Sequence, residues 1–451
     1  MFKQGGTAEY FGLSSLPLRR QSDGAFLIFE EVLGLLTQRP RGTADNLPGE
    51  VEKWQYLERI AEETFRKYHY REIRTPIFEH TELFARGVGE TTDIVAKEMY
   101  TFVDRGDRSV TLRPEGTAGV VRAYVEDKLY GNPGTEKLYY IGPMFRYEKP
   151  QKGRLRQFHQ YGCEVLGSEG PAVDAEVIAL NVDFLSQLGV KDMTVELNSV
   201  GCPVCRPKHR EQMIEKLLPR KDELCRDCQQ RLERNPLRIF DCKNEHCQWI
   251  LKDSGAPTIL DSLCDDCSTH FHAVEGYLKE MDLNYVINPK LVRGLDYYTR
   301  SAWEITVEGI GTIAGGGRYN GLVEQIGGPE TPGIGFAGGV ERALITLDEQ
   351  GFQWPKLDFV DVFVAVAQNA AEPLAMRFLQ AVRGAGFIAD RDYTGRGLKA
   401  QFKAADRASA KYVAVFGDSE LMNGTVTLKD LRTGEQQEVP FDEALSRLAK
   451  E

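Results

Sequence analysis

One predicted strand carries side chains that could line a polar pocket. Successive side chains of a strand alternate between its two faces, so in residues 156–166 Phe158, Gln160 and Glu164 share one face, with Gly162 between them. A buried amide or carboxylate that lacks a hydrogen-bonding partner costs about 1–3 kcal/mol. This face is therefore either solvated or part of a pocket that pairs its polar groups, and we expect the pocket.

The loop that precedes this strand is strongly basic. Residues 146–156 contain five cations and a single acid, Glu148, whereas the chain of 451 residues has a net charge of −11. Local positive charge on an acidic protein suits a phosphate-rich ligand; the alternative is an ordinary solvated hairpin tip. The acidic balance also argues against a general nucleic-acid coat protein. The five cations are Arg146, Lys149, Lys152, Arg154 and Arg156.

Eight of the nine cysteines fall within 66 residues of the chain. The cysteines of a disulfide framework in a secreted protein of this size would be spread along the whole chain. Three of their pairs have the Cys-x-x-Cys spacing, which lets two thiolates bind one tetrahedral ion and predicts structural zinc. His246, His270 and His272 are further candidate ligands. Reduced buried thiols and a decayed site are the alternatives. The candidates are Cys202, Cys205, Cys225, Cys228, Cys242, Cys247, Cys264 and Cys267.

Hydrophobic periodicity predicts the elements that position these residues. Residues 50–68 have apolar side chains at helical spacing, and a strand containing Pro76 is expected over residues 70–78. Residues 137–147 and 156–166 are expected to form an antiparallel hairpin. Glycine-rich turns at 315–317 and 338–339 are each expected to connect a strand to a helix.

Beyond residue 360 the expected strands and helices alternate. We expect strands over 361–367, 387–390 and 411–416, helices over 372–383 and 398–408, and a hairpin over 425–439. Such alternation predicts a small α/β domain with a mixed sheet. The polar residues 346–359 are expected to be a linker, and residues 1–36 a flexible extension. No apolar run is long enough to predict a transmembrane helix.

Four segments resemble the motifs of one enzyme family. Residues 140–148 with 156–160 resemble motif 2 of the class II aminoacyl-tRNA synthetases, and in detail that of the histidyl-tRNA synthetases. Residues 291–299, which contain Arg-Gly-Leu-Asp-Tyr-Tyr, resemble the histidine-specific signature of that family. Residues 333–342 resemble motif 3, and the first helix with the following strand resembles motif 1. The resemblance extends from about residue 36 to the C-terminus.

The resemblance implies an α+β fold. Its parts are a class II antiparallel-sheet catalytic domain over residues 37–345, with a cysteine-rich helical insert at about 200–270, and an α/β anticodon-binding domain over residues 360–451. The linker over 346–359 would join the two. Motif 1 forms the dimer interface of class II enzymes, so the resemblance also implies a homodimer, and we expect it in the cytoplasm with no membrane partner.

The implied activity is that of a ligase. It activates L-histidine with ATP to histidyl-adenylate, releases pyrophosphate, and transfers the histidyl group to the 3′ end of tRNA(His). The alternative is a non-catalytic, histidine-binding regulatory paralogue of histidine biosynthesis. Such paralogues typically lack the C-terminal domain and have altered motif residues, whereas this chain has both the domain and the motif arginines.

The resemblance also implies roles for individual residues. Arg146 and Arg293 are the implied catalytic residues and would hold the α-phosphate from opposite sides, although Arg293 could instead form a structural ion pair with Asp296 or a neighbour. Glu164 and Tyr298 would bind the two ring nitrogens of histidine, and Tyr319 is either a pocket residue or a simple core aromatic. The implied histidine-binding residues are Glu115, Gly116, Thr117, Arg146, Gln160, Glu164, Arg293, Tyr297, Tyr298 and Tyr319.

ATP and tRNA are assigned in the same way. Mg²⁺ is expected to accompany ATP, held largely by phosphate oxygens and water. The C-terminal domain would read the anticodon. The implied ATP-binding residues are Arg146, Glu148, Phe158 and Arg342. The implied contacts with the tRNA acceptor end are Lys149, Gln151, Lys152 and Arg154.

Overall fold

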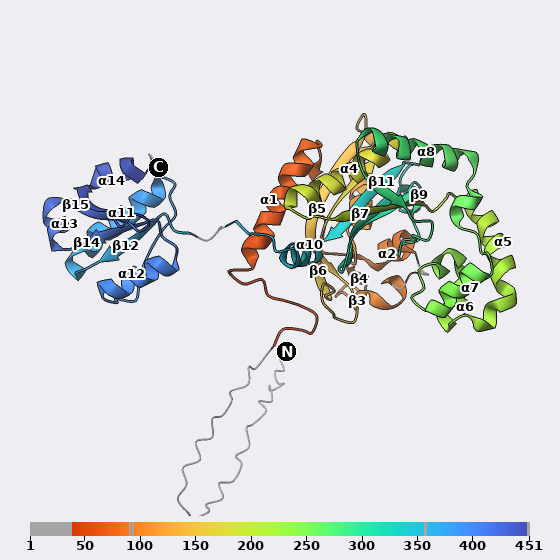
Figure 1. Cartoon of the computed structure of the whole chain (residues 1–451), viewed down its shortest axis with the longest axis horizontal. Coiled ribbons are helices and arrows are strands. Elements are labelled where there is room, and N and C mark those ends of the chain that lie inside the picture. The colour runs from red at the N-terminus through yellow and green to blue at the C-terminus, as the bar shows by residue number, and fades with distance from the viewer. Residues whose placement is uncertain (1–37, 90–91, 93, 356–358, 449–451) are drawn as a thin grey trace, which may run out of the picture. The chain divides into compact units, whose positions relative to one another are not determined.

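The computed structural model describes residues 38–89, 92, 94–355 and 359–448, and Figure 1 labels their helices and strands. The extension expected over residues 1–36 lies outside the described residues. Within them, none of the helices has the length and apolar character needed to cross a lipid bilayer.

An eight-stranded sheet of order β1-β5-β6-β11-β10-β9-β7-β8 carries the candidate site. Its neighbouring strands are antiparallel except at the two edges, where β1 pairs with β5 and β8 pairs with β7 in parallel. The expected hairpin is confirmed, with Glu136 opposite Leu166 and Phe145 opposite Gln157. The strands are β1 (Arg71–Glu72), β5 (Glu136–Phe145), β6 (Gln157–Leu166), β7 (Met193–Ser199), β8 (Tyr285–Ile287), β9 (Thr299–Val307), β10 (Gly311–Arg318) and β11 (Gly333–Gly339).

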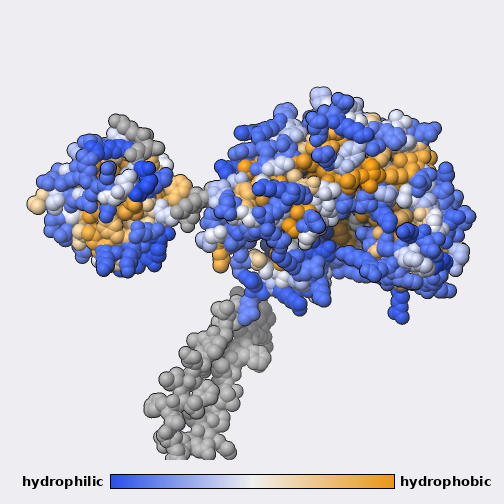
Figure 2. Space-filling model, in the orientation of Figure 1, coloured by the Kyte–Doolittle hydropathy of each residue, from blue (hydrophilic) through white to orange (hydrophobic). Residues whose placement is uncertain are grey.

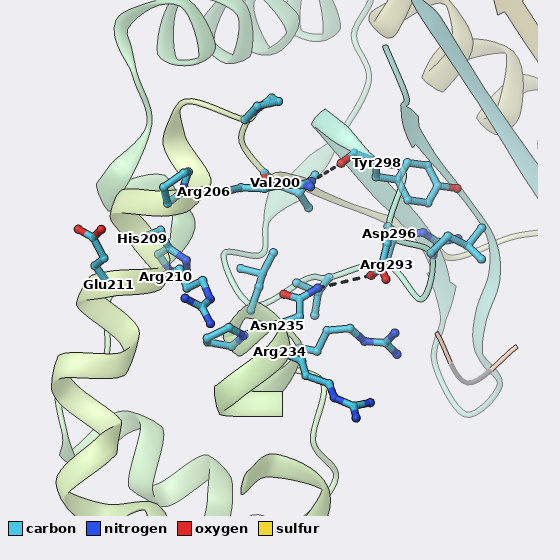
Figure 3. Close-up of a pocket in the computed structure, with 17 residues that line it drawn as sticks. Val200, Arg206, His209, Arg210, Glu211, Arg234, Asn235, Arg293, Asp296 and Tyr298 are labelled. Carbon is cyan, nitrogen blue, oxygen red and sulfur yellow. Dashed lines mark hydrogen bonds between the residues drawn. The ribbon is translucent and has the colours of Figure 1, made fainter. Parts of the chain in front are cut away.

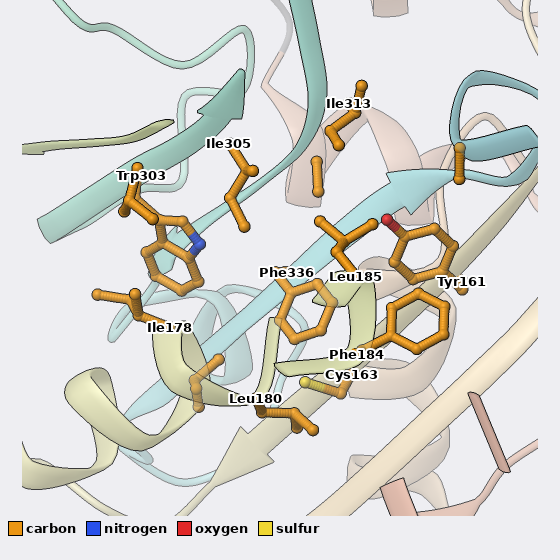
Figure 4. Close-up of a cluster of buried hydrophobic side chains, with 14 of the residues drawn as sticks. Tyr161, Cys163, Ile178, Leu180, Phe184, Leu185, Trp303, Ile305, Ile313 and Phe336 are labelled. Atoms are coloured by element: carbon orange, nitrogen blue, oxygen red, sulfur yellow. The ribbon is translucent and has the colours of Figure 1, made fainter. Parts of the chain in front are cut away.

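Four helices and the sheet share one apolar core. The helix expected over residues 50–68 is confirmed as α1, and its buried face includes Leu57, Ala61 and Phe65. Figure 4 shows the aromatic centre of this core, where the rings of Tyr161 and Phe184 lie 4.6 Å apart. The four helices are α1 (Val51–Lys67), α4 (Pro171–Leu188), α8 (Asp265–Glu280) and α10 (Val340–Glu349).

The single strand expected over residues 70–78 is wrong. β1 joins the large sheet, whereas β2 belongs to a small sheet of order β2-β4-β3. Pro76 lies between them and lacks the N–H that a continuous ladder needs, and Arg113 donates to the carbonyl oxygen of Thr75 at 3.0 Å. The small sheet and its neighbouring helices are β2 (Phe78–His80), β3 (Tyr100–Val103), β4 (Ser109–Leu112), α2 (Thr81–Val88), α3 (Thr117–Glu126) and α9 (Leu322–Gln325).

The glycine-rich turn expected at residues 315–317 is also wrong, because these glycines lie inside β10 and pair with β9 and β11 on both sides. A Cβ at Gly315 would lie 2.5 Å from Nη1 of Arg293, and one at Gly317 would lie 2.6 Å from the ring of Tyr298. Glycine is therefore required here by close side-chain approach and not by a turn. The expectation for Gly338 and Gly339 is confirmed, because β11 ends there and α10 follows.

The linker is expected over residues 346–359, but the structure continues with regular packing beyond residue 346. Helix α10 continues to Glu349, because Leu347 is buried in the core of the large sheet. Phe352 and Trp354 then pack against Tyr56 of α1, with ring centroids 5.8 Å away in both cases. The residues up to 354 thus pack with the part of the chain that is built on the large sheet.

The insert between β7 and β8 contains three helices that precede α8 (Figure 1). Its own small core includes Met213, Leu232 and Ile250, together with Cys228 and Cys247. Burying apolar surface against so few residues yields limited stability. The helices are α5 (Cys205–Leu217), α6 (Arg226–Arg234) and α7 (Glu245–Asp253), with short 3₁₀ turns at Leu218–Glu223, Pro236–Ile239 and Ile259–Ser262.

The C-terminal part has the expected mixed sheet, of order β13-β12-β14-β15-β16. Its first three strands are parallel, and β14, β15 and β16 form an antiparallel meander. All expected strands and helices are found, and two short helices, α13 and α14, are additional. The elements are β12 (Val362–Val366), α11 (Glu372–Gly384), β13 (Ala389–Arg391), α12 (Leu398–Arg407), β14 (Tyr412–Phe416), α13 (Asp418–Asn423), β15 (Thr425–Asp430), β16 (Gln436–Pro440) and α14 (Phe441–Leu448).

On the face that Figure 2 shows, hydrophilic residues predominate over both parts, with hydrophobic residues exposed among them.

Candidate active site

The expected polar pocket is a cavity of about 140 Å³ at the centre of the large sheet. Strands β6, β10 and β11 contribute to its lining, as do the start of α3 and the segment 293–298. Gln160 and Glu164 of β6 both line the cavity, as their shared parity predicts. The lining consists of Glu115, Thr117, Arg146, Gln160, Glu164, Arg293, Leu295, Tyr297, Tyr298, Gly315, Tyr319, Gly335, Phe336 and Ala337.

Glu164 is buried and surrounded by hydroxyl groups. Its Oε1 accepts hydrogen bonds from Thr117 Oγ1 at 2.7 Å and from the Tyr140 hydroxyl at 3.3 Å, and its Oε2 accepts one from the Tyr319 hydroxyl at 2.5 Å. Burial raises the pKa of Glu164 to about 8, even though the hydrogen bonds from Tyr319 and Thr117 oppose the shift. The carboxyl group can thus gain or lose a proton near neutral pH.

Glu115 lies just before the start of α3. Its two carboxylate oxygens accept hydrogen bonds from the backbone N–H groups of Thr117 and Ala118, both at 2.8 Å. Burial raises the pKa of Glu115, and these N–H groups oppose that shift. Gly116 does not line the cavity but packs against the ring of Tyr140, where no side chain would fit.

Two arginines lie in the cavity wall. Arg146 donates from Nε to the Pro114 carbonyl at 2.9 Å, and its guanidinium lies 5.3 Å from the ring centroid of Phe158. Arg293 forms an ion pair with Glu304 of β9 and not with Asp296. Its Nε is buried and has no hydrogen-bonding partner among the described residues, as is also true of Oε1 of Gln160. Buried polar atoms are usually hydrogen-bonded in proteins, so these two atoms are available to bond a group that enters the cavity.

A larger cleft of about 510 Å³ adjoins this cavity and shares Arg293, Leu295 and Tyr298 with it. Figure 3 shows that its opposite wall comes from the insert. The insert also holds the segment around Tyr298, because Arg206 donates to the Tyr298 carbonyl and Asn235 donates to Asp296 at 3.4 Å. The cations that line the cleft are Arg206, Arg210, Arg234, Arg238 and Arg293, against Glu211 and Asp296.

The cavity therefore combines a buried carboxyl group, hydroxyl groups and two guanidinium groups on an antiparallel sheet. A family model described as histidyl-tRNA synthetase matches residues 42–343 of the sequence. The chain belongs to the histidyl-tRNA synthetase family. A second model, described as an anticodon binding domain, matches residues 361–451.

Similar proteins cover almost the whole chain. The histidine–tRNA ligase of Desulforamulus reducens is 56% identical over 412 residues, which are 91% of this chain and 98% of that protein. The histidine–tRNA ligase of Moorella thermoacetica is 57% identical over 410 residues, 90% of this chain and 96% of that protein. The crystal structure of apo S. aureus histidyl-tRNA synthetase matches with a TM-score of 0.79 and 41% identity, over 92% of this chain and all of that chain.

Other residues predicted from the resemblance to histidyl-tRNA synthetases lie outside the cavity lining. Phe158 contacts Arg146, and Glu148 lies 3.5 Å from Arg154. Arg342 donates to the Thr312 carbonyl at 2.6 Å. Burial lowers the pKa of Arg342, and the neighbouring charge of Arg154 lowers it further. Two neighbouring guanidinium groups suit a polyanion.

The basic loop at residues 149–154 is exposed. Lys149, Gln151, Lys152 and Arg154 are all exposed. The backbones of Gln151 and Arg154 bond each other at 2.9 and 3.0 Å and close the loop into a tight turn, and Lys152 pairs with Glu349 of α10.

Sequence reasoning missed Tyr140 and Glu304. Tyr140 lies opposite Gly162 of β6 and thus beside Glu164, so pairing the two predicted strands in register would have found it. Glu304 alternates with the buried residues Trp303 and Ile305 and so lies on the opposite face of β9, a pattern that in the sequence looks the same as a solvated face. Its partner Arg293 comes from the segment before β9, and no sequence pattern shows that the two side chains pair.

Proposed function

We propose that this chain is a histidine–tRNA ligase, which activates L-histidine with ATP and transfers it to the 3′ end of tRNA(His). The observation that carries the proposal is the cavity in which Arg146, Arg293 and Glu164 converge. Family membership and the identity of 56% to a histidine–tRNA ligase support the same reaction.

Histidine activation needs positioning more than acid–base catalysis. The substrate carboxylate attacks the α-phosphorus of ATP, a bond to that phosphorus forms, and the bond to pyrophosphate breaks. No side chain has to remove a proton, so the enzyme must align the attack and stabilise phosphate charge. Arg146 and Arg293 are assigned this task, because a guanidinium presents a planar, permanently charged set of donors.

Glu164 is assigned the recognition of the imidazole ring. A neutral imidazole has one donor and one acceptor nitrogen. The carboxylate of Glu164, already accepting bonds from three hydroxyl groups, would accept the ring N–H. Tyr298 would donate a hydrogen bond to the other ring nitrogen. Tyr297 and Tyr319 would line the sides of the pocket around the ring. Glu115, Thr117 and Gln160 are assigned to the α-ammonium group, with Gly116 shaping the turn that presents them.

We expect this role of Glu164 to make histidine binding depend on pH. The ionised form is the stronger acceptor for the N–H, and the pKa of Glu164 is about 8, so the affinity for histidine should rise from about pH 7 to about pH 9 and level off above. Isothermal titration calorimetry across this range measures the effect. The variant Glu164→Gln keeps every other titrating group, and the same rise in that variant would contradict the assignment.

ATP is assigned to the outer part of the site. Phe158 would stack on adenine, Glu148 would accept from its amino group, and Arg342 with Arg146 would contact phosphates. The Mg²⁺ that accompanies ATP supplies charge neutralisation. In the part of the chain that the structure describes, groups of three or more potential metal ligands are found only as cysteine clusters outside the cavity, so Mg²⁺ would be held by phosphate oxygens and water.

The tRNA is assigned to the exposed loop Lys149–Arg154 and to the C-terminal domain. Replacing Lys149 and Lys152 together with alanine should raise KM for tRNA(His) and leave pyrophosphate exchange unchanged, because exchange needs no tRNA. Filter binding at several salt concentrations should show a log–log slope smaller by about 0.7–0.9 for each phosphate that the loop no longer neutralises. An unchanged slope would remove the loop from the tRNA interface. A homodimer, which the resemblance to motif 1 implies, and a cytoplasmic location belong to the same proposal.

Exchange of pyrophosphate into ATP tests the proposed function. We expect exchange with histidine and none with threonine or proline. Binding of histidine without exchange would overturn the proposal and favour the regulatory paralogue. Against that alternative, the chain contains the anticodon-binding segment at residues 361–451 and both motif arginines.

A further inference from the structure

The eight cysteines of the insert converge on two separate points. Each cluster holds four sulfur atoms that all lie within 4.8 Å of one another. One cluster consists of Cys202, Cys205, Cys264 and Cys267, and the other of Cys225, Cys228, Cys242 and Cys247. In each cluster two cysteines are buried and two are partly exposed. The ninth cysteine, Cys163, lies in the core of the large sheet and belongs to neither.

The sulfur spacing fits one tetrahedral ion in each cluster. A Zn–S bond of about 2.3 Å places tetrahedral sulfurs about 3.8 Å apart. The sulfur of Cys202 lies 3.6 Å from that of Cys205 and 3.9 Å from that of Cys264, and the sulfurs of Cys225 and Cys242 are 3.9 Å apart. Disulfides need about 2.05 Å, and all nine cysteines are free thiols.

The histidines that the sequence offered as ligands are engaged elsewhere. His270 contacts Asp174 through Nε2 at 3.0 Å, and His272 contacts Glu275 at 3.0 Å. The ring of His246 stacks on Trp249, with centroids 5.6 Å apart. Both sites are therefore built from sulfur alone, which is a ligand set typical of structural zinc.

Both clusters also have the same pattern of backbone N–H donors. The N–H two residues after the first cysteine of a turn bonds that cysteine's sulfur, from Val204 to Cys202 and from Asn244 to Cys242, each at 3.4 Å. The N–H of a cysteine from the facing segment bonds another sulfur. These bonds run from Cys264 to Cys205 at 3.1 Å and from Cys225 to Cys247 at 3.3 Å. Such donors stabilise thiolates that bind a metal, and their repetition in two unrelated segments indicates a built site.

Each cluster joins segments that are separate in the sequence. The first connects the start of α5 to the start of α8, 62 residues apart between Cys202 and Cys264. The second connects the start of α6 to the start of α7 within the small core of the insert. Domains with few buried apolar residues commonly depend on metals or disulfides for stability.

We propose that this chain binds two structural zinc ions, one in each four-cysteine cluster. The first ion would also help to position a segment of the candidate active site. Arg206 follows Cys205 in the chain and donates to the carbonyls of Val200, at 3.1 Å, and of Tyr298. The first ion therefore fixes the start of the helix that holds the Tyr298 segment, and the second ion fixes the outer part of the insert.

Metal analysis of the wild-type protein tests the proposal without relying on any variant. The protein purified under reducing conditions should contain two zinc ions per chain by inductively coupled plasma mass spectrometry. Titration with an organomercurial should consume eight thiols of the insert as it releases both ions. Absence of zinc with eight freely reactive thiols, iron in place of zinc, or disulfides in the insert would each overturn the proposal.

Variants separate the two sites. Cys267→Ser and Cys228→Ser should each lower the zinc content from two ions to one, and the double variant should contain none. Cys163→Ala is the matched control, because it removes a buried cysteine outside both clusters, and it should retain two ions. A zinc content of one ion in the wild type, or loss of both ions in the Cys163 variant, would contradict two independent sites.

Discussion

Replacing Arg293 with alanine is expected to lower the rate of histidine-dependent pyrophosphate exchange by about 10²–10³-fold, the usual effect of losing one donor to a developing charge. Arg293 lines the cavity, and its guanidinium group lies against Gly315 of β10. Glu304 occupies one end of the guanidinium, which leaves other N–H donors for a phosphate. The measurement is kcat/KM for histidine in the exchange reaction.

Two further variants make this result specific. Arg293→Lys keeps the charge but not the planar fork, so it should recover only part of the rate. Arg122→Ala also removes an arginine ion pair, to Glu79 at 2.7 Å, but outside the cavity, and it should leave exchange unchanged. Wild-type exchange in Arg293→Ala would show that the ion pair with Glu304 is the whole role of this residue.

The largest loss of stability is expected from Asp174→Ala. Asp174 of α4 and Arg318 of β10 form an ion pair in which both side chains are fully buried. Removing one partner leaves an uncompensated buried charge, which typically costs about 3–5 kcal/mol. Urea unfolding of the variant, followed by tryptophan fluorescence because Trp303 is buried in the same domain, should show a correspondingly lower midpoint.

The pH dependence of this contribution has a definite sign. Burial opposes ionisation of Asp174, but the hydrogen bond from His270 and the charge of Arg318 outweigh it and lower its pKa. The stabilisation is therefore fully present above the ordinary pKa of about 3.8 and is lost as the pH falls through the lowered value. The double variant Asp174→Leu with Arg318→Met should regain most of the stability. A loss below about 1 kcal/mol in Asp174→Ala would contradict the expectation for a buried pair.

Local patterns predicted much of the fold and part of the candidate site. The alternation of side chains on one strand was enough to place Gln160 and Glu164 in one cavity, and helical spacing was enough to place α1. Features that depend on contacts between distant segments of the chain could not be predicted from the sequence. The glycines of β10 look like a turn in the sequence because the residues that require them, Arg293 and Tyr298, come from another segment.

The cysteines illustrate the same limit. The Cys-x-x-Cys spacing predicted metal ligands, but it could not show which pairs combine. Cys202 and Cys205 combine with Cys264 and Cys267, across a sequence interval that contains the entire second cluster. This combination depends on the packing of α5 against the turn before α8. Such a tertiary contact leaves no local pattern in the sequence.

The glycines of β10 and β11 limit how the cavity can be reshaped. Where the sheet borders the cavity at Gly315 and Gly335, the surface is main chain with no side chain to shorten. A synthetase redesigned to charge tRNA with a bulkier, unnatural amino acid must therefore gain its space from the walls, at Thr117, Tyr297 or Tyr319. Shortening the side chain of Thr117 or Tyr319 removes a hydroxyl group that bonds Glu164, so under the role proposed for Glu164 the selectivity for the imidazole ring would be lost as the cavity grows.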